Sequence, residues 1–206
     1  MSRKIDVAAA ARRLLEAGNI LILTHRRPDG DTVGSAAALC RALRKAGKEA
    51  WVFANEDITP RLGFLLEGLT APADYAHDFV VAVDIADTTL LTDSAKVFAD
   101  SIDLCLDHHP SNKEFAQELV LHEKAAAAGE VIYLTAKALG VEFDLPMWEA
   151  LYIAVATDTG CFKFSNRGRV RVGARARARR PLGLATDGRR SRELGRCCEP
   201  GLGGEG

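Results

Sequence analysis

The chain has 206 residues, a formal net charge of −1 and 48% hydrophobic residues. This length fits one large domain or one domain with an extra segment, because domains commonly hold about 100–200 residues. No apolar run approaches the ~20 residues of a membrane span. The alanine-rich N-terminal stretch is broken by Arg12, Arg13 and Glu16, so it resembles an amphipathic helix more than a signal peptide. We therefore expect a cytoplasmic protein with no membrane association.

Helical and strand patterns alternate along the chain up to Asn166. Asp6 can cap a first helix that Gly18 ends, and Gly47 ends a second one. The helices predicted in chain order are 6–17, 34–46, 60–66, 125–139 and 147–156, and the strands are 20–23, 50–54, 79–83, 102–106 and 161–164. Continuous apolar strands separated by helices indicate an α/β fold, with a parallel sheet covered by helices on both faces.

The last part of the chain has a different composition. Residues 167–206 contain 11 arginines, 4 acids and 9 of the 18 glycines, with no lysine, isoleucine or aromatic residue. Large apolar side chains are too few there to build a core. We predict one folded domain over residues 1–166 and a disordered Arg/Gly-rich tail over residues 167–206.

Three of the predicted strands end in residues that can carry chemistry. These residues are Thr24-His25, Asp84 and Asp107-His108-His109. In open α/β sheets, ligands bind beyond the carboxyl ends of the strands. If these strands are parallel, their polar ends meet at one edge of the sheet.

The stretch THRRPDGD, from Thr24 to Asp31, follows the first of these strands. Pro28 and Gly30 shape a tight bend, so that Asp29 and Asp31 can face different partners. Each motif has an ordinary explanation when it is taken alone. PDGD is a common turn sequence, a single histidine after a strand is usually a surface or capping residue, and acids often follow strands. The convergence of three motifs on one edge favours a site.

The predicted edge gathers five carboxylates and three imidazoles. They belong to His25, Asp29, Asp31, Asp84, Asp107, His108, His109 and Asp158. Close carboxylates repel one another unless cations compensate their charge. Mixed imidazole and carboxylate ligands suit Mn²⁺, Fe²⁺, Co²⁺ or Zn²⁺, and the lack of a cysteine cluster argues against a structural zinc site. Two metal ions would clamp a phosphoryl group and generate a hydroxide between them.

Four segments in this order resemble the motifs of the DHH phosphoesterase superfamily. They are HRRPDGDTVGSA, VAVDIAD, LDHHPSN and ATDTGCFKFSN. Their detailed sequence patterns are most similar to the bacterial nano-RNase (oligoribonuclease) and pAp-phosphatase branch. These patterns are PDGD-x-x-GS, DHH-x-SN and TDTG-x-F. The resemblance covers residues 1–166. It implies an N-terminal DHH domain that carries two Mn²⁺ ions and a smaller C-terminal lobe, with a GGGH-type motif, that binds substrate.

The resemblance also implies substrates and residue roles. The family hydrolyses short RNA oligonucleotides, 3′-phosphoadenosine 5′-phosphate, or linear and cyclic dinucleotides; a homodimer is an assembly that we leave open. His25 and Asp29 would hold one metal, Asp31, His108 and Asp158 would hold the other, and Asp84 would bridge both. Asp107 would orient its neighbours, and His109 would contact the scissile phosphate. Ser35, with the N-terminal amides of its helix, would help to receive phosphate.

The resemblance ends after Asn166. No GGGH motif follows, and the remaining 40 residues are too few for the substrate lobe. We interpret the tail as an out-of-frame reading of GC-rich DNA and expect the C-terminal lobe to be missing; an RNA-binding arm is the alternative, since clustered arginines neutralise phosphates. The expected function is a two-metal phosphodiesterase or phosphatase that the truncation impairs. The alternative is a non-catalytic, truncated gene product that retains metal binding.

Overall fold

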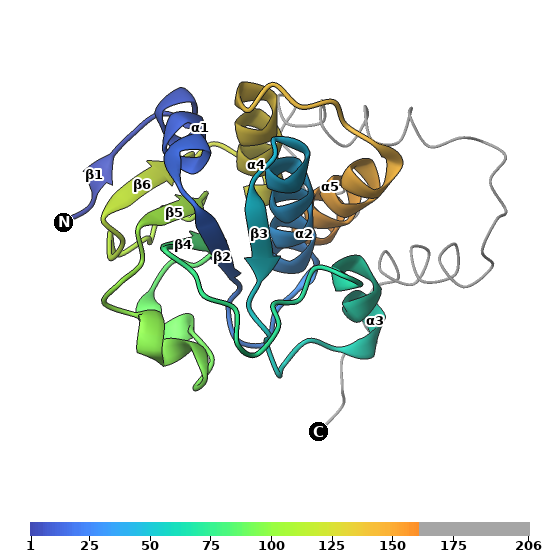
Figure 1. The fold of residues 1–206 in the computed structure, drawn as a ribbon, viewed down its shortest axis with the longest axis horizontal. Helices are drawn as coiled ribbons and strands as arrows, with labels where there is room; N and C mark the ends of the chain where they lie inside the picture. Colours follow the sequence, from blue (N-terminus) through green and yellow to red (C-terminus); the bar gives the residue numbers. More distant parts are fainter. Residues whose placement is uncertain (161–206) are drawn as a thin grey trace, which may run out of the picture.

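The computed structural model describes residues 1–160, in which six strands form one sheet (Figure 1). The strands are β1 (Arg3–Lys4), β2 (Asn19–Leu23), β3 (Glu49–Val52), β4 (Phe79–Val83), β5 (Leu104–Asp107) and β6 (Glu118–Leu121). Their order across the sheet is β1-β6-β5-β4-β2-β3, and every neighbouring pair is parallel. The predicted α/β class with a parallel sheet is confirmed.

Helices cover both faces of this sheet, but unequally. The α-helices are α1 (Val7–Glu16), α2 (Gly30–Lys45), α3 (Pro60–Gly63), α4 (Ala128–Ala138) and α5 (Leu145–Asp158), and the 3₁₀ helices are η1 (Phe64–Leu66), η2 (Thr88–Leu90) and η3 (Ala95–Phe98). All five α-helices lie on the side of the sheet that carries Ile22 and Val81 and contribute to one core with it. The opposite face, with Leu23 and Val80, is covered by the segment of η2 and η3. Within residues 1–160, no helix has the length and apolar composition needed to cross a membrane.

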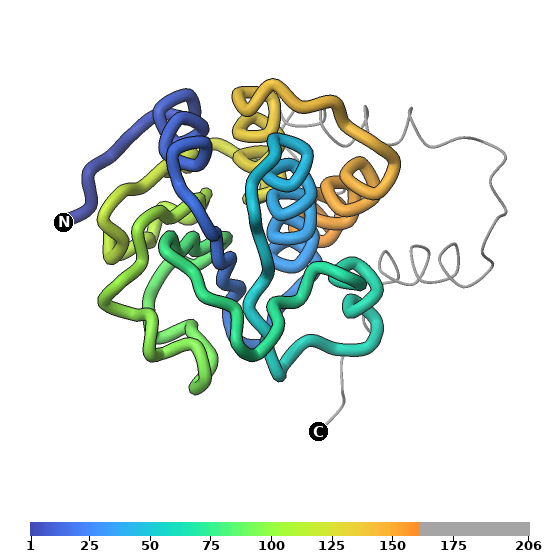
Figure 2. The backbone as a smooth tube through the Cα atoms, in the orientation of Figure 1, coloured from blue at the N-terminus to red at the C-terminus, as the bar shows by residue number. Residues whose placement is uncertain are grey.

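Helix α2 forms a buried layer between the sheet and α5, as the ribbon and the tube both show (Figures 1 and 2). Thirteen of its 16 residues are buried. The two helices run antiparallel, because Lys45 Nζ lies 3.1 Å from Asp144 Oδ2 at one end while Gly30 faces Thr157 at the other. This arrangement brings Asp158, the last residue of α5, to the beginning of α2.

The observed elements differ from the predicted ones at identifiable places. Helix α2 begins four residues before the predicted start at Gly34, because Asp29 caps it by accepting hydrogen bonds from the N–H groups of Asp31 and Thr32 at 2.9 and 3.1 Å. Strands β1 and β6 were not predicted, since runs of two and four residues carry little periodicity. The predicted strand 161–164 and the predicted tail 167–206 lie outside the described residues.

Candidate metal centre

The predicted site residues meet at the carboxyl ends of β2, β4 and β5, which are adjacent strands of the sheet. Three groups of side chains each place their donor atoms within 4.8 Å of one another. The groups are His25-Asp29-Asp84, Asp31-His108-Asp158 and Asp84-His108-His109. All six residues predicted as metal ligands therefore occur in these groups, and Asp84 and His108 each occur in two.

Asp84 lies between His25 and His108. It follows β4 directly and has a φ of 60°, a left-handed conformation that is uncommon for residues other than glycine. Its Oδ2 lies 3.8 Å from Nε2 of His25, and its Oδ1 lies 3.5 Å from Nε2 of His108. One buried carboxylate therefore faces His25 with one oxygen and His108 with the other.

The loop between β2 and α2 presents His25 and Asp29 on one side of Asp84. Nδ1 of His25 lies 2.8 Å from the carbonyl oxygen of Arg26. A hydrogen on Nδ1 satisfies this contact and leaves Nε2 as the nitrogen that can bind a metal. Nε2 lies 3.8 Å from Oδ1 of Asp29, the same oxygen that caps α2.

Asp31 lies on the other side, buried in the first turn of α2. Its Oδ2 accepts a hydrogen bond from the N–H of Ala128 at 2.6 Å, and its Oδ1 accepts one from Gly129 at 3.0 Å. A carboxylate is stabilised there because it faces the positive end of the α4 dipole. Ser35 is fully buried, and its hydroxyl donates to Asp31 at 3.1 Å. The phosphate contact expected of Ser35 stays a prediction, and its observed partner is a candidate metal ligand.

The two histidines after β5 have different Nδ1 contacts, although both rings lie 3.5 Å from Oδ1 of Asp84. The predicted division, with one histidine on a metal and the other on substrate, stays a prediction. Nδ1 of His109 lies 2.8 Å from Oδ1 of Asp107, and the amide of Asn112 donates to Oδ2 of Asp107 at 2.6 Å. Nδ1 of His108 instead lies 3.3 Å from the carbonyl oxygen of Ala125. Asp107 is fully buried, so these hydrogen bonds hold its carboxylate in place.

Nε2 of His108 points into the cluster of carboxylates. It lies 3.7 Å from Asp31 Oδ2, 3.5 Å from Asp84 Oδ1 and 3.6 Å from Asp158 Oδ2. Three carboxylates from three different elements therefore converge on one imidazole nitrogen.

Burial and mutual repulsion dominate the electrostatics of the cluster. Burial, followed by the charge of Asp158, raises the pKa of Asp31 to about 8. Burial and then the charge of Asp31 also raise the pKa of Asp84 well above its ordinary value. Burial raises the pKa of Asp158 and lowers that of His108, whereas the hydrogen bond with Asp107 raises the pKa of His109. Cations between these carboxylates would remove the repulsion.

Two buried atoms at the centre of the cluster are unsatisfied. Asp84 Oδ1 and His108 Nε2 have no hydrogen-bond partner among the described residues, although buried polar atoms normally have one. A divalent cation would satisfy both atoms, and their imidazole and carboxylate chemistry suits Mn²⁺, Fe²⁺, Co²⁺ or Zn²⁺. The residues present therefore fit a metal centre.

Comparison with known proteins identifies the family. A sequence model described as the DHH family, N-terminal domain, matches residues 19–157. The chain belongs to the DHH family. The matched residues include all of the candidate ligands except Asp158.

Two relatives of this DHH chain carry the name bifunctional oligoribonuclease and PAP phosphatase NrnA. The protein from Thermus thermophilus is 32% identical over 169 residues, which are 79% of this chain and 50% of that protein. The protein from Bacillus subtilis is 28% identical over 151 residues, which are 71% of this chain and 48% of that protein. The chain thus spans about half the length of these relatives.

Solved structures share the fold of the DHH domain. An exopolyphosphatase-related protein from Bacteroides fragilis matches with a TM-score of 0.75 and 19% identity, over 93% of this chain and 59% of that one. A putative family II inorganic pyrophosphatase from Methanococcus jannaschii matches with a TM-score of 0.56 and 15% identity, over 77% and 55%. At these identities the likeness shows a common fold.

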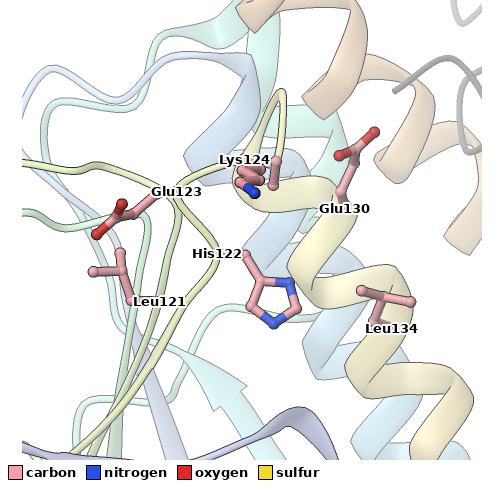
Figure 3. Close-up of a pocket in the computed structure, with 7 residues that line it drawn as sticks. Leu121, His122, Glu123, Lys124, Glu130 and Leu134 are labelled. Carbon is pink, nitrogen blue, oxygen red and sulfur yellow. The ribbon is translucent and has the colours of Figure 1, made fainter. Parts of the chain in front are cut away.

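A pocket of ≈ 710 Å³ lies between the segment after β6 and the first turns of α4 (Figure 3). Its lining residues are Leu121, His122, Glu123, Lys124, Ala125, Glu130 and Leu134. One of its lining residues, Ala125, has its carbonyl oxygen 3.3 Å from Nδ1 of His108. The structure places His122, the one histidine of this segment, in the lining. Glu123 and Glu130 outnumber Lys124, so the pocket lacks the excess positive charge that favours phosphate.

Several groups that support the cluster were not anticipated from the sequence. Ala125 contributes a carbonyl oxygen, and Ala128 and Gly129 contribute backbone N–H groups. No side-chain pattern signals such contacts. The role of Asn112 was also not anticipated, although the sequence carries a signal for it. Asn112 stands in LDHHPSN, five residues after Asp107, whose carboxylate it contacts.

Proposed function

We propose that this chain carries the metal centre of a phosphoesterase that hydrolyses short oligoribonucleotides, dinucleotides or 3′-phosphoadenosine 5′-phosphate. The relatives named as oligoribonuclease and PAP phosphatase support this substrate class. The observation that carries the proposal is the position of Asp84, whose two carboxylate oxygens face His25 on one side and His108 on the other.

Two divalent cations, with Mn²⁺ the first candidate, fit this donor set. We assign His25 and Asp29 to one ion, assign Asp31, His108 and Asp158 to the other, and let Asp84 serve both. When bound, such ions supply positive charge to phosphoryl oxygens and activate water at neutral pH.

His109 is the residue proposed to contact the scissile phosphate. Its Nδ1 is engaged by Asp107, which leaves its other ring nitrogen for a phosphoryl oxygen. Asn112 holds the second oxygen of Asp107 and so limits rotation of this carboxylate. A donor fixed in this way stabilises negative charge as it develops on the phosphoryl group, without reorganisation during the reaction. Asp107 acts on the reaction through His109.

Hydrolysis of a diribonucleotide by the purified chain with Mn²⁺ tests the proposal. We expect metal-dependent release of mononucleotides, and a loss of at least ~10²-fold in His109→Ala, as for removal of an electrostatic or acid–base group. Asp93→Ala is the control, because this acid is exposed and pairs with Lys96 away from the cluster. The rate should lie below that of relatives twice as long, since binding energy from their additional half can orient the phosphate. Metal binding without any hydrolysis would favour the alternative, a non-catalytic product that retains metal binding.

A further inference from the structure

The segment after β3 holds the loop that carries His25. The side-chain amide of Asn55 donates to the hydroxyl of Thr24 and to the carbonyl oxygen of His25, both at 2.9 Å. Its Oδ1 accepts a hydrogen bond from the N–H of Asp57 at 2.9 Å, and Oδ2 of Asp57 accepts one from Arg27 at 2.9 Å. Asn55 therefore ties both ends of the turn from His25 to Arg27, one end directly and the other through Asp57.

These contacts fix an unusual backbone conformation. Arg27 has a φ of 49°, in the left-handed region that most residues avoid. Such a conformation persists only where surrounding contacts enforce it. On the opposite side of the turn, the N–H of Arg26 donates to the carbonyl oxygen of Leu90 at 2.6 Å. The turn is thus held between the segment after β3 and η2, and the tube shows the chain leaving β3 beside the end of β2 (Figure 2).

The held turn determines where the His25 imidazole points. The Arg26 carbonyl oxygen, at the centre of the turn, lies 2.8 Å from Nδ1 of His25. With its hydrogen on Nδ1, the ring presents a lone pair on Nε2, which lies 3.8 Å from both Asp29 and Asp84. Partners of this kind, behind a metal-binding histidine, fix its tautomer and orientation.

We propose that Asn55 is a positioning residue for the His25 half of the metal centre. It holds the Arg26 carbonyl oxygen against Nδ1 of His25, so that Nε2 is the nitrogen offered to a cation. The metal-binding part of this inference rests on the proposed function, whereas the effect on the tautomer of His25 does not.

Two variants and one control test this role. Asn55→Asp keeps the size of the side chain and removes its N–H donors. Asn55→Ala removes all of the side-chain hydrogen bonds of Asn55. Asp78→Ala is the matched control, because it removes hydrogen bonds at the other end of β2, the strand that His25 follows. Oδ1 of Asp78 accepts from the N–H groups of Gly18 and Asn19 at 3.1 and 3.0 Å there. Circular dichroism establishes that each variant folds.

The first readout is the ¹⁵N chemical shifts of the His25 ring in metal-free protein, at a pH where the imidazole is neutral. We expect a single tautomer with the hydrogen on Nδ1 in the wild type and in Asp78→Ala, and a mixture of tautomers in both Asn55 variants. A single unchanged tautomer in the Asn55 variants would overturn the proposal.

The second readout is calorimetric titration with Mn²⁺. We expect one of two binding events to weaken by about 10–100-fold in the Asn55 variants, the usual effect of losing a partner of a metal-binding histidine. An equal loss of Mn²⁺ affinity in Asp78→Ala would show that the effect comes from general destabilisation, and it would contradict the proposal. If the wild type binds no Mn²⁺ but the Asn55 variants still show a mixture of His25 tautomers, the proposed function fails and the positioning role stands.

Discussion

Gly34 of α2 lies against Ala150 of α5 so closely that a Cβ built on Gly34 would stand 2.5 Å from the Ala150 carbonyl oxygen. One turn earlier, a Cβ on Gly30 would stand 2.5 Å from the side chain of Thr157. The two glycines let the helices approach closely at the end where Asp158 joins the metal centre. Their role is therefore to bring a candidate ligand into reach, in addition to packing.

Gly34→Ala is expected to lower the free energy of unfolding by about 1–3 kcal/mol, because the new methyl group meets a backbone carbonyl that cannot rotate away. Chemical denaturation measures the change. Gly63→Ala is the control, since no atom of residues 1–160 lies within 4 Å of a Cβ there, and alanine favours helix. Equal stability of the Gly34 variant and the wild type would mean that the helices are not in close contact.

Asp84→Asn is expected to stabilise the metal-free protein and to abolish its stabilisation by Mn²⁺. The neutral amide keeps the shape of the side chain, tolerates the positive φ, and removes one charge from a cluster in which carboxylates repel one another. Each kcal/mol of relieved repulsion should raise Tm by roughly 2–4 °C. Thermal melts with and without Mn²⁺ measure both effects, because a ligand that binds only the folded state raises Tm. A wild-type increase in Tm that persists in this variant would contradict the assignment.

Glu118 supplies a pH-dependent contribution to stability far from the metal centre. Its carboxylate is 6% exposed and accepts hydrogen bonds from Arg3 and, at 2.9 Å, from Arg13, which tie β6 to β1 and α1. Burial acts to raise the pKa of Glu118, but the hydrogen bonds from the two arginines outweigh it and bring the pKa below its ordinary value. The stabilisation is therefore complete above the pKa of the unfolded chain and is lost as pH falls through the folded pKa.

Glu118→Gln should accordingly lower the free energy of unfolding by about 1–3 kcal/mol at pH 7. The difference from the wild type should shrink below pH ~4.3, the ordinary pKa of a glutamate. Urea denaturation at several pH values measures both. Glu16→Gln is the control, because Glu16 pairs with Arg13 at the surface, and such pairs contribute about 0–1 kcal/mol. A penalty that stays constant down to pH 3 would refute the ionic explanation.

Part of this fold could be predicted from the sequence for clear physical reasons. The run Phe79–Val83 was predicted with its observed bounds, because five consecutive apolar residues are typical of a strand buried on both faces. The start of α2 was missed because PDGD was interpreted only as a turn, although Asp29 also caps the helix. Strand β6 was missed because its four residues include the charged Glu118, which the arginines on β1 and α1 compensate.

The candidate site could likewise be predicted only in part from the sequence. Residues at the ends of neighbouring parallel strands must lie near one another, so the grouping of His25, Asp84 and His108 could be predicted from the order of the elements. The contact between Asn55 and the His25 carbonyl oxygen could not, since it joins two loops 30 residues apart. The backbone amides that donate to Asp31 could not be predicted for a similar reason. They lie 97 and 98 residues further along the chain.

Metal stoichiometry of the purified chain tests the central claim most directly. Elemental analysis after equilibration with Mn²⁺ should find about two ions per chain in the wild type and in Asp93→Ala, as expected for a two-metal centre. Asp84→Ala should lose at least one of them, because Asp84 occurs in two of the three groups of candidate ligands. A wild type that binds no Mn²⁺, or an Asp84→Ala variant that keeps both ions, would contradict the account.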